Sequence, residues 1–138
     1  KVTVLATEIL PAAGTVINRI GYEGQCEGGV VMGYGYAVTE NYAYTDEAKP
    51  ATKNFQTYLI PTMADMPNVE ITPVEDQVYS GPYGARGLGE PVIVPAGTAV
   101  TNAVCDALGF RINSLPYNQE KVLKAYNENK RSNSEVGK

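Results

Sequence analysis

Residues 23–41 read EGQCEGGVVMGYGYAVTEN, a helix-like stretch with an unusual load of glycine. Its apolar residues recur at roughly helical spacing, which favours a helix. Gly28, Gly29, Gly33 and Gly35 each weaken a helix by up to about 1 kcal/mol relative to alanine, so packing has to compensate. Gly29 and Gly33 lie four residues apart on one face, with Gly28 beside them. We therefore expect another helix or strand to approach this face closely, the alternative being a ligand.

Outside this stretch, the sequence predicts several short strands. The β-branched run VTVLATEI predicts a strand over residues 2–9, and the alternating residues 69–74 predict another. TVINRI (15–20) and FRINSLP (110–116) are typical of short extended pieces, and Tyr42 and Tyr44 of a short strand and turn. Prolines at 50, 61 and 67 prevent a long element, so residues 46–68 are expected to form surface loop and short helical turns.

Two further helices are predicted after this loop-rich region. PAGTAVTNAVCDALG (95–109) has apolar residues at helical spacing, Pro95 in a first-turn position and Gly109 as a C-cap. NQEKVLKAYNENK (118–130) is typical of an amphipathic helix that Asn118 caps. Strands and helices mixed without a regular βαβ rhythm indicate the α+β class. We expect residues 1–130 to form a single α+β unit and residues 131–138 a flexible tail.

Composition excludes several classes of function. The 138 residues suit one domain, and 11 basic against 15 acidic residues give a net charge of −4. Nucleic acid and membrane are therefore not expected partners, and no apolar stretch approaches the roughly 20 residues of a spanning helix. The chain has no histidine, which removes Ser/His/Asp and Cys/His nucleophile systems and histidine metal sites. Cys26 and Cys105 are expected to be buried or free thiols in a reducing cytoplasm.

The loop GPYGARGLGEP (81–91) carries a single glutamate, Glu90, between Gly89 and Pro91. One interpretation is an exposed carboxylate or an ion-pair partner of Arg86. The other is a buried general base, aimed by the stiff turn, with the glycines letting the backbone lie against a flat ligand. Gln25 has the same two interpretations, a surface amide or a donor and acceptor for the edge of a heteroaromatic ring.

Three segments in this order resemble the molybdenum-binding subunit of the xanthine dehydrogenase and aldehyde oxidase family. They are EGQCEGGVVMGYGYAVTE, IPTMADMP and the stretch from GPYGARGLGEP to EKVLKA, so that the resemblance covers roughly residues 2–125. The family's subunit is several times longer than this chain. The resemblance therefore implies a C-terminal piece of a molybdopterin-binding domain, inactive when isolated, with the remainder of the subunit as its first partner.

The resemblance also implies a chemistry and a site. In the family, Glu90 corresponds to the catalytic base, and Gln25, with Gly24 and Gly89 beside the same motifs, to a contact with the molybdenum–molybdopterin cofactor. The reaction is hydroxylation of an N-heterocycle or aldehyde, a small-molecule substrate, with water as the oxygen source. Electrons then leave through iron–sulfur clusters and FAD on other domains or subunits. Tyr83 and Arg86 are expected near the substrate's approach, and no residue of this chain is expected to bind the metal.

A second hypothesis belongs to another class of function. The chain could share the fold but serve only as a catalytically silent structural or assembly domain. The intact GEP motif and Gln25 favour the enzymatic interpretation.

Overall fold

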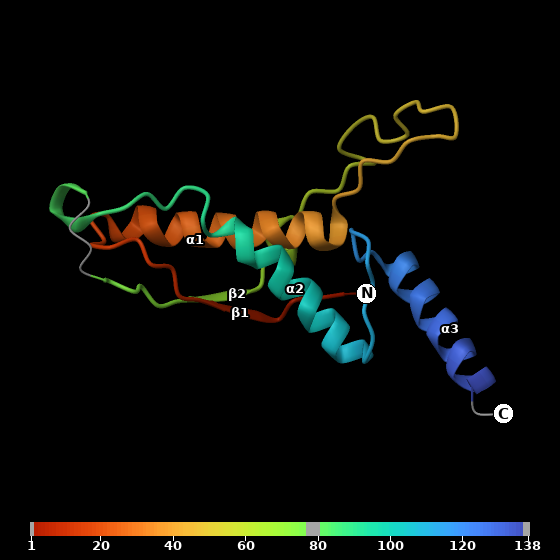
Figure 1. Cartoon of the computed structure of the whole chain (residues 1–138). Coiled ribbons are helices and arrows are strands. Elements are labelled where there is room, and N and C mark those ends of the chain that lie inside the picture. The colour runs from red at the N-terminus through yellow and green to blue at the C-terminus, as the bar shows by residue number, and fades with distance from the viewer. Residues whose placement is uncertain (1, 77–80, 137–138) are drawn as a thin grey trace.

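The computed structural model describes residues 2–76 and 81–136 (Figure 1). Within them lie three α-helices, one two-stranded sheet, a π-helix and two 3-10 helices, which confirms the predicted α+β class. In chain order the elements are β1 (Ala6–Ile9), α1 (Arg19–Tyr34), the π-helix Gly35–Thr39, the 3-10 helix Met63–Asp65, β2 (Asn68–Ile71), the 3-10 helix Pro82–Gly84, α2 (Ile93–Leu108) and α3 (Gln119–Val136).

The two strands pair in parallel, with Ala6 opposite Asn68 and Ile9 opposite Ile71. A parallel pair needs a long crossover, and here the crossover contains α1 and the whole loop region. Burial alternates along both strands, so that Ile9 and Ile71 are half-buried and pack against the core below α1. Both strands were predicted, although the first is shorter than the β-branched run suggested.

The glycine face of α1 packs against the first turns of α2, as the spacing predicted. A Cβ built on Gly29 would lie 2.8 Å from the Cβ of Val92, and one on Gly33 only 2.5 Å from the Cβ of Ala96. Any side chain at either position would push the two helices apart. Gly28, by contrast, faces open space, so the expectation that it shares the contact is wrong.

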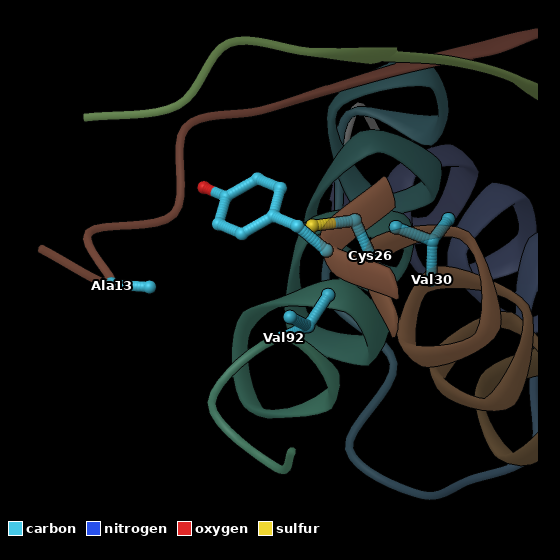
Figure 2. Packing of buried hydrophobic residues seen from close by; sticks show 5 residues of the cluster. Ala13, Cys26, Val30 and Val92 are labelled. Atoms are coloured by element: carbon cyan, nitrogen blue, oxygen red, sulfur yellow. The ribbon is translucent and has the colours of Figure 1, made fainter. Parts of the chain in front are cut away.

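Two small clusters of buried side chains form the core. The first gathers Ala13, Tyr22, Cys26, Val30 and Val92 from the segment before α1, from α1 itself and from the residue before α2 (Figure 2). The second joins Tyr34, Ala37, Val38 and Val100 around the π-helix and α2. Both cysteines are buried and free, as predicted, and burial raises the pKa of the Cys26 thiol.

Three predicted extended pieces are absent from the described residues. Arg19 and Ile20 belong to α1, because the Asn18 side chain accepts a hydrogen bond from the Gly21 N–H and begins the helix there. Around Tyr44 there is one isolated bridge, to Pro50, and no strand. Residues 110–116 find no strand to pair with, and Tyr117 holds this segment instead through its N–H to the Ala37 carbonyl and its hydroxyl to the Ile112 carbonyl.

Residues 41–61 project from the body as a long loop (Figure 1), as the prolines predicted. α3 begins at the predicted cap, where the Asn118 side chain accepts a hydrogen bond from the Lys121 N–H at 2.9 Å. It continues to Val136, six residues beyond the predicted helical stretch, and lies apart from α1 and the sheet (Figure 1). The flexibility of residues 131–138 stays a prediction. None of the helices in the described part of the chain is long and apolar enough to cross a membrane.

Candidate functional site

Residues 81–91, which we call the GEP loop, are hydrogen-bonded to the segment that precedes α1. The Thr15 N–H donates to the Gly84 carbonyl at 3.0 Å, and the Arg86 N–H donates to the Ala13 carbonyl at 2.8 Å. Gly14 makes the approach possible, since its φ is +62° and a Cβ there would lie 2.0 Å from the Gly84 oxygen. Residues 81–91 are therefore fixed to the entrance of α1, although they are distant from it in the sequence.

Glu90 lies at the turn that leads into α2. Its carbonyl accepts a hydrogen bond from the Ile93 N–H at 3.2 Å, and Val92, only 1% exposed, anchors the turn in the core. The Glu90 side chain itself is exposed. A carboxylate just before a helix is favoured electrostatically, because the helix N-terminus carries a partial positive charge. The exposed carboxylate agrees with the first of the two interpretations of Glu90, and burial would have to come from surface outside the described residues.

Gln25 approaches the GEP loop from α1. A Cβ built on Gly89 would lie 3.8 Å from the Gln25 Nε2, the nearest atom to it. An open pocket of about 310 Å³ lies between the two segments. The predicted residues among its lining are Gln25, Arg86 and Gly89, and they are joined by Asn18 and Tyr22.

The other predicted site residues lie around this pocket rather than in its lining. Gly24 is exposed one position before Gln25 on α1. Tyr83 has a positive φ of 57° and is 89% exposed, outside the pocket. Glu90 follows the lining residue Gly89 directly. The structure thus brings Gln25, Gly89 and Arg86 together, with Glu90 adjacent, and it leaves Tyr83 apart.

Sequence reasoning missed two acidic residues, Glu75 and Asp76, that lie close to the GEP loop and to the segment before α1. Asp76 forms an ion pair with the guanidinium of Arg86, and the Glu75 carboxylate accepts a hydrogen bond from the Val16 N–H at 3.1 Å. The signal was the adjacent pair of carboxylates in VED, five residues before the glycine-rich loop begins. Tyr22 was also missed. Its hydroxyl donates to the Pro11 carbonyl at 2.6 Å, and burial raises its pKa.

The groups at this pocket suit the edge of a flat polar ring. The Gln25 amide offers a donor and an acceptor, and Gly89 leaves the neighbouring backbone uncovered by a side chain. Among residues 2–76 and 81–136, no three His, Cys, Asp or Glu side chains gather in a way that could hold a metal ion. The pocket therefore offers hydrogen-bonding groups and uncovered backbone to the edge of an organic ring.

Comparisons with known proteins identify the family of this chain. Residues 1–67 match the molybdopterin cofactor-binding domain. The chain is 40% identical over 114 residues to a subunit of a probable xanthine dehydrogenase from Bacillus subtilis, a match that covers 83% of this chain and 15% of that protein. This chain belongs to the xanthine dehydrogenase family of molybdopterin-binding subunits. Its relatives include a xanthine dehydrogenase subunit named for binding molybdenum, and the matched domain is one that binds the molybdopterin cofactor.

Two other relatives show how widely this part is shared within the family. Aldehyde oxidoreductase of Megalodesulfovibrio gigas is 32% identical over 126 residues, which is 91% of this chain and 14% of that protein. The solved structure of quinoline 2-oxidoreductase from Pseudomonas putida superimposes with a TM-score of 0.86 at 30% identity, over 91% of this chain and 16% of that one. The chain thus spans only about a sixth of the length of these relatives, or slightly less.

Proposed function

We propose that this chain forms one wall of the active site of a molybdenum hydroxylase, as the C-terminal piece of its molybdopterin-binding domain. One observation carries the proposal. Gln25 and Gly89 line the same pocket, and Glu90 is the residue that follows Gly89. Gln25 comes from α1 and Glu90 from the turn before α2, and Gly89, the residue before Glu90, approaches the Gln25 amide. Family relatives named for xanthine, quinoline and aldehyde oxidation support this assignment.

The pocket residues would hold the cofactor at its edge. The Gln25 amide would donate to and accept from polar atoms of the pterin, while Gly24 and Gly89 leave the space beside it free of side chains. When bound, the cofactor supplies the redox chemistry, and the protein supplies binding, orientation and a base.

Glu90 would act as the general base. Its Oε atoms would accept the proton of the water-derived nucleophile as that nucleophile forms a bond to carbon of an N-heterocycle or aldehyde. Pro91 and the anchored Val92 limit the freedom of the turn that aims this carboxylate. Its present exposure means that the remainder of the subunit has to cover it, since a base works best where water is excluded.

The chain alone would not complete the reaction. In the proposed reaction, iron–sulfur clusters and FAD on other domains or subunits would accept the electrons. We therefore propose that the isolated chain is inactive. Tyr83 remains a proposed substrate-proximal residue, because its exposed ring lies on the same loop as Glu90.

Replacing Glu90 by Gln tests the proposal in the assembled, molybdenum-loaded enzyme. The change keeps the shape of the side chain and removes the base, and we expect kcat to fall at least about 100-fold. Glu128→Gln, an exposed carboxylate on α3, is the matched control and should turn over at the parent rate. Molybdenum content has to stay near one per assembly in both variants.

The same assay also distinguishes this proposal from the second hypothesis, a catalytically silent structural or assembly domain. A Glu90→Gln enzyme that holds its molybdenum and works at the parent rate would leave this chain only a structural or assembly role. An active, complete assembly without molybdenum would reject the whole proposal.

A further inference from the structure

Arg86 joins three segments next to the pocket: the GEP loop, the segment before α1 and the segment after β2. Its N–H donates to the Ala13 carbonyl at 2.8 Å, which ties the GEP loop to the entrance of α1. Its guanidinium pairs with Asp76, which ties the same loop to the segment after β2. The neighbouring Glu75 accepts the Val16 N–H at 3.1 Å, so this acidic segment holds both other loops.

The segment between Arg86 and Glu90 has few restraints of its own. A Cβ on Gly87 would meet nothing within 4 Å, and one on Gly89 would meet only Gln25. Leu88 packs partly against the core, and beyond Glu90 the buried Val92 fixes the start of α2. Two glycines in so short a span leave the backbone many conformations unless both ends are held. On the N-terminal side Arg86 is the anchor nearest to Glu90, and the Thr15–Gly84 hydrogen bond holds the loop two residues earlier.

The ion pair also changes what Arg86 can do toward a substrate. The side chains of Arg86 and Asp76 are 33% and 41% exposed, so the pair is partly buried, and the carboxylate compensates the guanidinium charge. Because its charge is already balanced by Asp76, the Arg86 guanidinium attracts an anionic substrate only weakly. Its position in the pocket lining is therefore better explained by support of the loop than by capture of a ligand.

We infer that the Asp76–Arg86 ion pair positions the loop that aims Glu90, so that Arg86 is a positioning residue rather than a substrate-binding one. The inference rests on the proposed role of Glu90. Both residues act through the backbone of residues 86–90, and neither takes part in proton transfer.

Kinetics of the assembled, molybdenum-loaded enzyme give the first test. Arg86→Met and Asp76→Asn should each lower kcat by roughly 10- to 100-fold, the loss expected when a catalytic group is misplaced by about 1 Å. KM should change less than twofold for neutral and anionic substrates alike. The double variant should be no slower than the slower single variant, because both changes break one interaction. Arg86→Lys should recover part of the rate, since it keeps the charge but not the planar fork.

Hydrogen exchange gives a second readout that does not depend on turnover. In Arg86→Met and Asp76→Asn, amides of residues 84–90 should exchange faster than in the parent, while those of α1 and α2 stay unchanged. A partly exposed ion pair contributes little to global stability, so the variants should still fold. Arg19→Met is the matched control, because it removes the ion pair with Glu23 on the surface of α1 and should leave the loop's exchange unchanged.

The outcomes separate this inference from the proposed function. Unchanged loop exchange in both variants, or a KM that rises only for anionic substrates in Arg86→Met, would overturn the positioning role. If Glu90→Gln retains the parent rate, the proposed function fails, yet the exchange experiment still reports whether the ion pair holds the loop. Faster loop exchange together with lower kcat and constant KM supports the inference.

Discussion

Gly33→Ala tests whether the contact between α1 and α2 holds the fold together. The new Cβ would lie 2.5 Å from the Ala96 Cβ and 2.8 Å from the Gly97 nitrogen. Carbon atoms in contact prefer about 3.5–4.0 Å, so the helices would have to separate by roughly 1 Å. Neither neighbour can rotate away, because one is backbone and the other has no side chain beyond Cβ.

The magnitude follows from two opposing effects. Forcing an extra carbon into a packed contact costs about 1–3 kcal/mol. Alanine in place of glycine returns up to about 1 kcal/mol of helix propensity. With the rigid neighbours placing the strain in the upper part of its range, we expect a net loss of about 1–2 kcal/mol in the free energy of unfolding. For a chain of this size that lowers the Tm by about 3–5 °C for each kcal/mol.

Gly28→Ala is the matched control on the same helix. Nothing lies within 4 Å of a Cβ at Gly28, so only the propensity gain applies, and this variant should be more stable by about 0.5–1 kcal/mol. Thermal and denaturant unfolding of the two purified variants and the parent show whether each substitution raises or lowers the free energy of unfolding. A Gly33→Ala protein at least as stable as the parent, or the same sign for both changes, would refute the close contact.

Two further predictions follow from single residues. Gly14→Ala should lower the free energy of unfolding by about 2–4 kcal/mol, because Gly14 has a positive φ and a Cβ would meet the Gly84 carbonyl. Denaturant unfolding measures this loss, and a loss smaller than that of Gly33→Ala would contradict the close approach of the Gly84 carbonyl to Gly14. Burial and the hydrogen bond with Cys105 raise the pKa of Tyr117 to about 12. The folded state therefore keeps this proton more tightly than the unfolded state, and the contribution to stability is full below pH 10 and is lost as pH rises toward 12. Tyr117→Phe should flatten that part of the pH profile, and an unchanged slope would contradict it.

The sequence was informative wherever a local pattern had one structural solution. Glycines four apart on a helix predicted a close neighbour, and α2 lies there. Pro95 and Gly109 predicted α2 nearly to its ends, and Asn118 predicted the start of α3. These features depend on a few adjacent residues, which is why they could be found without knowledge of the fold.

The failures concern residues whose structure is decided by distant partners. Residues 110–116 have a strand-like sequence, but a strand needs a neighbour, and Tyr117 binds them to the π-helix instead. The ion pair of Asp76 with Arg86 joins residues ten positions apart in the sequence, which no periodicity reveals. Glu90 and Gln25 were proposed as site residues through family resemblance, and the approach of Gln25 to Gly89 came only from the structure.

The glycine contact that decides the fold also sets the geometry of the proposed site. Gln25 and Gly29 lie one helical turn apart on α1, while Glu90 and Val92 lie two residues apart at the start of α2. Since Gly29 lies against Val92, the approach of these two backbones contributes to the distance from the Gln25 amide to the Glu90 turn, together with the anchoring of the loop before it. A larger residue at Gly29 would move the Glu90 turn away from Gln25 even if the protein stayed folded. Small residues are therefore required there by packing and, if Glu90 is the base, by catalysis as well.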